Sequence, residues 1–220
     1  MKRDDRKIYI LLAGFCLLGA VVLALCLTAR AGLPDNVGRE LTVDETAEAV
    51  ARNSPLTEYV FLSPNADFPR AEKIEKITIH HMAGDLALEA LGLSFSNRDR
   101  RASSNYAVDS QGRVAMYVEE SNRAWTSSSP ENDNQAVTIE VANDEIEGDW
   151  HVSDAAFDKL IDLCADICRR NNIPELVFTG DTNGNLTLHK MFNSETQCPG
   201  PYLESRMEDI VRLVNERLKG

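Results

Sequence analysis

The stretch Lys76-Ile77-Thr78-Ile79-His80 alternates polar and apolar side chains, the pattern of a β-strand with one face in the core. A period of two places Ile77 and Ile79 on the core face and His80 on the opposite face. The run Ala136-Val137-Thr138-Ile139-Glu140-Val141 has the same pattern, with Thr138 and Glu140 opposite its apolar residues. Both segments therefore predict strands that direct polar side chains away from the core.

Further elements follow in the chain after this first strand. Residues 105–108 and 114–118 flank a glycine-containing turn and predict a hairpin. Ser153 is a favourable N-cap for a helix that ends near residues 171–174, and its apolar face comprises Phe157, Leu160, Ile161, Cys164, Ile167 and Cys168. A last helix carries on one face Leu203, Met207, Ile210, Val211, Val214 and Leu218. The pattern predicts an α/β fold over residues 74–220, with a central mixed β-sheet flanked by amphipathic helices.

Composition and charge exclude several classes of protein. The chain has 220 residues, 43% of them hydrophobic and 26% charged, which is ordinary for a globular protein and not for a collagen-like or disordered one. Its net charge is −12, and residues 1–31 hold five of the bases and two of the acids, so residues 32–220 carry −15. So acidic a domain is a poor sequence-independent partner for nucleic acid. Five cysteines are too few for a disulfide scaffold.

The N-terminus contains an uncharged run of 21 residues, 8–28. As a helix it would be about 31 Å long, enough to cross a bilayer core. Four bases precede the run, within residues 1–7, and only Arg30 directly follows it, which places a basic tail in the cytoplasm and the rest of the chain outside. We therefore expect a single-pass cell-membrane protein whose folded domain is extracytoplasmic. The alternative is a cleaved signal peptide, because Ala29-Arg30-Ala31 resembles a cleavage site, and the protein would then be secreted.

Residues 29–73 are expected to form a linker and an N-terminal extension. Thr42 and Glu45 have the spacing of a capping box, which predicts a short helix to about Asn53. Pro55, Pro64 and Pro69 then favour extended or turning chain.

Histidine and cysteine placement suggests a metal site. A catalytic zinc needs three protein ligands and one open position for water. His189 and Cys198 lie nine residues apart in a stretch rich in Asn, Gly and Pro, where a loop can direct both toward one point, and His80 at the end of its strand would be the third ligand. His81 points to the other strand face and His151 precedes a helix, so packing or surface roles are favoured for both.

The surroundings of these residues carry a family resemblance. The segments are Thr78-Ile79-His80-His81-Met82-Ala83, Leu188-His189-Lys190 and Thr196-Gln197-Cys198-Pro199-Gly200, with Ser104-Asn105-Tyr106, Arg123-Ala124-Trp125-Thr126 and Val137-Thr138-Ile139-Glu140 between them. In this order they resemble the zinc-dependent N-acetylmuramoyl-L-alanine amidase family, which includes amidase-type phage lysozymes and animal peptidoglycan recognition proteins. The resemblance covers about residues 74–203.

The resemblance implies hydrolysis of the amide between N-acetylmuramic acid and L-alanine in peptidoglycan, with Zn²⁺ held by His80, His189 and Cys198. It implies that Tyr106 hydrogen-bonds the oxyanion and that Glu140 acts as general base, or alternatively holds a zinc ligand in place. Some relatives have a catalytic lysine where this chain has Thr196, so less positive charge is available to the oxyanion. Trp125 and Arg123 are candidates for binding the sugar or peptide of the substrate.

Other functions and properties stay open at this point. The domain could be a peptidoglycan-binding module without turnover, or a zinc peptidase that cuts within the stem peptide. Non-catalytic relatives usually lose the cysteine ligand, and Cys198 is present, which favours the enzyme. The chain has no H-E-x-x-H motif of common zinc proteases. The expected partners are peptidoglycan and, through the N-terminal helix, the membrane; the oligomeric state is undetermined.

Overall fold

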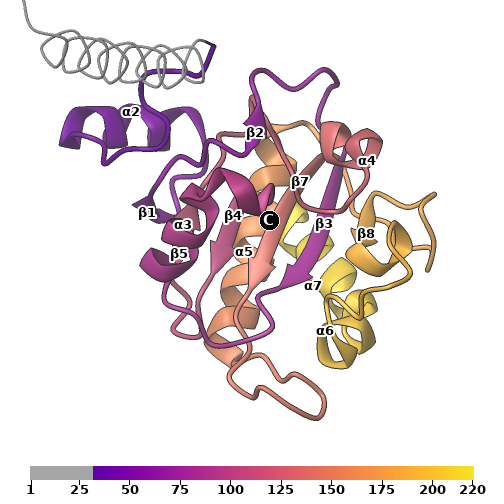
Figure 1. Ribbon diagram of the computed structural model, residues 1–220. Coiled ribbons are helices and arrows are strands. Elements are labelled where there is room, and N and C mark those ends of the chain that lie inside the picture. The colour runs from indigo at the N-terminus through magenta and orange to yellow at the C-terminus, as the bar shows by residue number, and fades with distance from the viewer. Residues whose placement is uncertain (1–31) are drawn as a thin grey trace, which may run out of the picture. The chain divides into compact units, whose positions relative to one another are not determined.

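A computed structural model describes residues 32–220 (Figure 1). The predicted cytoplasmic tail and transmembrane segment, residues 1–28, lie outside the described residues. Within residues 32–220, no helix combines the length and the apolar character that crossing a bilayer requires.

The domain is built on a six-stranded sheet in the order β1-β5-β4-β7-β3-β8. Only β4 and β5 pair antiparallel, and the other neighbours are parallel, so the predicted mixed sheet is confirmed. The strands are β1 (Thr57–Val60), β3 (Lys76–His81), β4 (Tyr106–Val108), β5 (Val114–Met116), β7 (Ala136–Val141) and β8 (Leu186–Leu188). A separate antiparallel pair joins β2 (Ala66–Asp67) to β6 (Arg123–Ala124).

Helices cover both faces of this sheet (Figure 1). They are α2 (Val43–Arg52), α3 (Leu88–Ser96), α4 (Pro130–Gln135), α5 (Asp154–Arg170), α6 (Pro201–Ser205) and α7 (Met207–Lys219). One face packs in a large apolar cluster with α5 and α7, and it includes Ile77, Ile79 and Tyr106. The opposite face packs Ala107 and Ala115 against α3. His80 and Glu140 alternate with the residues of the large cluster and belong to the α3 side of the sheet.

Local signals explain the helix starts. The hydroxyl of Ser153 accepts a hydrogen bond from the amide of Ala156 at 3.1 Å, as expected for the N-cap of α5. Thr42 and Glu45 form the predicted capping box of α2. The predicted last helix is divided into α6 and α7, because Arg206 between them leaves helical geometry and its amide donates to the carbonyl of Leu203.

The N-terminal extension packs together with the predicted domain of residues 74–220. The compact unit spans Asn36–Gly220, because β1 adds a parallel edge strand beside β5. The amide of Phe61 then donates to the carbonyl of Met116, and the ring of Tyr59 packs edge-on against Tyr117. Pro55 lies before β1 and Pro64 lies after it, so the prolines of this segment do not interrupt the strand.

Candidate metal centre and active site

Three side chains converge at one end of the parallel strands. Ligand atoms of His80, His189 and Cys198 all lie within 4.8 Å of one another. Sγ of Cys198 is 3.6 Å from Nδ1 of His80, and the two imidazole rings are 4.7 Å apart. The structure therefore brings together the three residues that the sequence suggested as ligands.

Strand pairing explains how the two histidines meet. Strands β3 and β8 are parallel neighbours with Ile79 opposite Leu188, so the residues that follow, His80 and His189, emerge at the same edge. His189 begins a short 3-10 helix, His189–Met191, that turns the chain away from the sheet.

Backbone contacts place the third donor. The amide of Lys190 donates to the carbonyl of Cys198 at 3.1 Å, which closes the intervening loop. The amide of His81 donates to Sγ of Cys198 at 3.3 Å. Thr196 contributes through its hydroxyl, which accepts a 3.1 Å hydrogen bond from the amide of Cys198. The predicted catalytic position Thr196 thus shapes the loop that carries the cysteine.

The donor set suits a zinc ion. Nε2 of His80 and Nε2 of His189 are buried and have no hydrogen-bond partner among the described residues. Burial, with the charge of His189 nearby, holds the pKa of His80 well below its usual range, and burial also lowers the pKa of His189. Both rings are therefore neutral near pH 7 and have lone pairs available. Two imidazoles and one thiol leave a tetrahedral ion one open position.

Glu140 lies next to this cluster. It is the register partner of His80 across β3 and β7, and its Oε2 is buried without a hydrogen-bond partner. Burial raises the pKa of Glu140 to about 8, and the charge of Arg100 opposes that rise. A carboxyl group with a pKa near neutrality can both accept and donate a proton, as general acid–base catalysis requires.

Tyr106 lies elsewhere, and the prediction that it hydrogen-bonds the oxyanion is wrong. The strand period turns its ring toward the apolar face covered by α5, whereas Glu140 lies on the other face. The Tyr106 hydroxyl donates to Oε1 of Glu120 at 2.7 Å and accepts from the amide of Ser54 at 3.1 Å. Its ring is fully buried.

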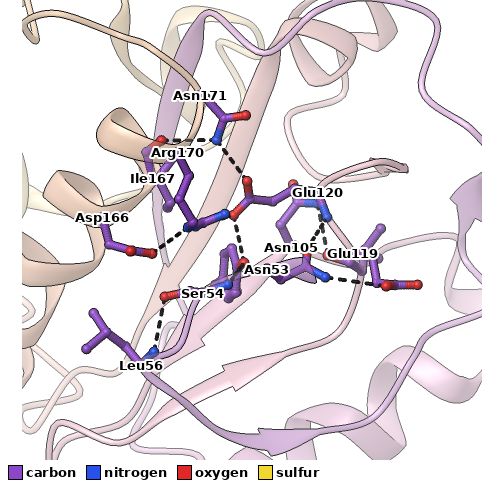
Figure 2. Close-up of polar contacts among 12 residues, drawn as sticks. Asn53, Ser54, Leu56, Asn105, Glu119, Glu120, Asp166, Ile167, Arg170 and Asn171 are labelled. Atoms are coloured by element: carbon purple, nitrogen blue, oxygen red, sulfur yellow. Dashed lines mark hydrogen bonds and ion pairs between the residues drawn. The ribbon is translucent and has the colours of Figure 1, made fainter. Parts of the chain in front are cut away.

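Glu120 is the centre of a buried polar network (Figure 2). Its carboxylate accepts from Nη2 of Arg170 at 2.6 Å and from Nδ2 of Asn171 at 2.8 Å, and its amide donates to Asn53 at 2.8 Å. Figure 2 shows these contacts linking the end of α2 to the end of α5. The role of Tyr106 is therefore structural: it helps attach the N-terminal extension to the sheet.

Trp125 and Arg123 line a cavity of about 530 Å³, and His189 lines it as well. Nε1 of Trp125 donates to Oδ1 of Asp67 at 3.0 Å, and Nε of Arg123 donates to Oδ2 of the same carboxylate at 2.7 Å. Because Arg123 is ion-paired with Asp67, it is not a free cation for a substrate carboxylate. Trp125 remains the better candidate for substrate contact.

The other histidines lie beside the cluster or away from it. The ring of His81 packs edge-on against Trp150, with centroids 5.2 Å apart. His151 bonds to Asp144 through Nδ1 at 2.6 Å. Neither belongs to the group of three metal donors among residues 32–220.

Sequence reasoning missed Arg100, which lines a cavity of about 230 Å³ together with Glu140, His189, Thr196 and Cys198. The signal for it in the sequence is the basic segment Arg98-Asp99-Arg100-Arg101.

Comparisons with known proteins agree with this architecture. The sequence profile of the N-acetylmuramoyl-L-alanine amidase family matches residues 70–201. No curated protein sequence matches the chain.

Solved structures with the same fold include a mutant of PlyL, with 18% identity, a TM-score of 0.56, and coverage of 71% of this chain and 96% of that one. AmpD has 17% identity and a TM-score of 0.55, over 70% and 93% of the two chains. A mutant endolysin from Bacillus subtilis has 18% identity and a TM-score of 0.55, over 71% and 97%. The profile match spans more than half of the chain, and the chain therefore belongs to the N-acetylmuramoyl-L-alanine amidase family.

Proposed function

We propose that this protein is a zinc-dependent amidase that hydrolyses the bond between N-acetylmuramic acid and L-alanine in peptidoglycan. The observation that carries the proposal is the convergence of His80, His189 and Cys198 beside Glu140 in a chain of this family. Three of these groups, His189, Cys198 and Glu140, come from separate parts of the sequence and line one cavity, and His80 lies buried within 4.8 Å of the other two metal donors.

The residues of the site would have two roles, metal binding and proton transfer. His80, His189 and Cys198 would hold a zinc ion, which when bound lowers the pKa of water to about 7 and polarises a carbonyl group. Glu140 accepts the proton of the attacking water and returns it to the departing amine nitrogen. The raised pKa of Glu140 matches this two-way role.

The neighbouring cavity supports binding of an extended substrate. Its lining joins Trp125 to His189, so a sugar or peptide on the indole would lie close to the metal donors. Trp125 is held by Asp67, which fixes the ring before substrate arrives.

We further propose that residues 8–28 anchor the protein in the cell membrane, with the catalytic domain outside. The support is the uncharged 21-residue run with basic residues before it. Peptidoglycan lies on that side of the membrane, which agrees with the proposed substrate. A cleaved signal would instead give a secreted enzyme of the same activity.

Product analysis on purified peptidoglycan tests the proposed activity. The zinc-loaded protein is expected to create new L-alanine amino termini and leave the glycan strands intact. Chelation and Cys198→Ser should abolish the release, whereas His151→Ala should not. Binding without release by zinc-loaded protein would favour a binding module, and new termini within the stem peptide would favour a peptidase.

A further inference from the structure

The cavity beside the metal donors has a mixed lining. Apolar side chains form one part of it, namely Met82, Ala83, Leu86, Leu91 and Phe95. The remaining lining consists of the donors His189 and Cys198 with His81, Thr196, Glu140 and Arg100. Arg100 is the single Lys or Arg among the described residues that line this cavity.

Arg100 is held in place without being neutralised. It ends the 3-10 helix Arg98–Arg100, and its guanidinium carbon lies 5.7 Å from the centroid of the Phe95 ring. Phe95 is itself buried, with its ring edge-on to Tyr117. Among residues 32–220, no hydrogen bond or ion pair engages the Arg100 guanidinium. The aromatic face therefore orients the cation and leaves its N–H groups available.

The proposed reaction requires such a group. The oxygen of water forms a bond to the amide carbon, and the carbonyl oxygen takes an electron pair and becomes negative. When the carbonyl re-forms, the C–N bond breaks and the nitrogen takes a proton, giving a carboxylic acid and an amine. The negative oxygen needs a hydrogen-bond donor or positive charge in place before the reaction.

Other groups near the site are poorly suited to this task. The Thr196 hydroxyl carries no positive charge, and the Tyr106 hydroxyl is bound to Glu120 on the other face of the sheet. Arg123 is ion-paired with Asp67 in the neighbouring cavity. Glu140 offers no positive charge, and its carboxyl group is assigned to proton transfer. The field of Arg100 does reach the site, since it acts on Glu140 against the effect of burial.

We propose that Arg100 is the catalytic cation of this site and binds the oxygen that becomes negative during amide hydrolysis. The inference rests on the proposed amidase function and adds a residue to it. Its anion-binding part can be measured independently of turnover.

The first experiment uses inorganic phosphate as a tetrahedral oxyanion probe for the zinc-loaded, full-length protein. Calorimetry at constant ionic strength compares the wild type with Arg100→Met, Arg100→Lys and the matched control Arg98→Met. Arg98→Met removes the same charge from the same short helix but does not line the cavity. We expect Arg100→Met to weaken phosphate binding about tenfold, Arg100→Lys to weaken it less, and Arg98→Met to leave it within twofold. Equal affinities in the wild type and Arg100→Met, equal losses in both methionine variants, or no phosphate binding by the wild type would each overturn the inference.

The second experiment measures amide hydrolysis by the same proteins. Arg100→Met is expected to lower kcat at least tenfold with KM little changed, because the interaction forms only as charge develops. A raised KM with unchanged kcat would make Arg100 a ground-state substrate contact and overturn the catalytic role. Zinc content and thermal unfolding of each variant establish that the exposed substitution has not disturbed the fold. If the wild type shows no hydrolysis, the proposed function fails, whereas the phosphate titration still decides whether Arg100 binds an oxyanion.

Discussion

His80 and Glu140 are direct register partners on the parallel strands β3 and β7, on the face of the sheet opposite the large apolar cluster. This pairing brings a metal donor and an unpartnered carboxyl oxygen together through backbone geometry alone. The loop that carries Cys198 then completes the site from one side, through the amide of His81. Because rigid strands hold two of these groups, their spacing does not depend on loop conformation.

Glu140→Gln should separate chemistry from metal binding. We expect kcat to fall at least 100-fold, since general acid–base catalysis typically contributes about 100- to 10,000-fold. Zinc content should not change, because Glu140 is not one of the three donors. Release of L-alanine amino termini per bound zinc provides the measurement, with Glu208→Gln on the exposed side of α7 as control. Loss of zinc together with activity would instead show that Glu140 acts by holding His80.

Zinc content should fall when His80, His189 or Cys198 is replaced, and it should not change when another histidine is replaced. The wild type is expected to retain one zinc per chain after dialysis, and His80→Ala, His189→Ala and Cys198→Ser should retain much less. His151→Ala serves as control, because His151 bonds to Asp144 away from the cluster. Elemental analysis alongside protein concentration gives the stoichiometry. Retention of a full equivalent by any of the three donor variants would contradict this ligand set.

Tyr106→Phe should reduce stability and leave turnover intact. The substitution removes the donor to Glu120 and leaves the buried amide of Ser54 without its acceptor. We expect the free energy of unfolding to fall by about 1–3 kcal/mol, measured by urea denaturation. Tyr59→Phe is the matched control, because the Tyr59 hydroxyl has no hydrogen-bond partner in the described part of the chain. A large loss of kcat in a fully folded Tyr106→Phe protein would restore the catalytic assignment.

The contrast between Tyr106 and Glu140 shows which inferences from sequence succeed. The two long strands β3 and β7 have a clear period of two, so the faces of His80 and Glu140 were predictable. The same period puts Tyr106 and Val108 on the apolar face with Ile139. The catalytic assignment for Tyr106 came from resemblance and conflicted with that periodicity.

Other parts of the fold had no local signal to predict them. Strands β1 and β8 have four and three residues, which is too short for periodicity to identify them. They form because neighbouring strands offer unpaired edges, and this is a tertiary effect. Arg100 was missed for the same reason, since its place in the cavity depends on α3 carrying Phe95 to the site.

Trp125→Ala should weaken substrate binding more than it slows chemistry. The indole lines the cavity shared with His189, and its Nε1 bond to Asp67 fixes the ring in a wall of that cavity. An aromatic contact contributes about 0.5–1.5 kcal/mol to binding in addition to the energy of burying its surface. We therefore expect KM to rise roughly three- to tenfold with kcat nearly unchanged.

Trp125→Phe should give an intermediate KM, because it keeps an aromatic face but loses part of the ring area and the bond to Asp67. Steady-state hydrolysis of a defined muropeptide gives both constants. If Trp125→Ala lowered kcat with KM unchanged, the indole would act at the reacting bond. The cavity between Trp125 and His189 would then not be the place where a remote part of the substrate binds.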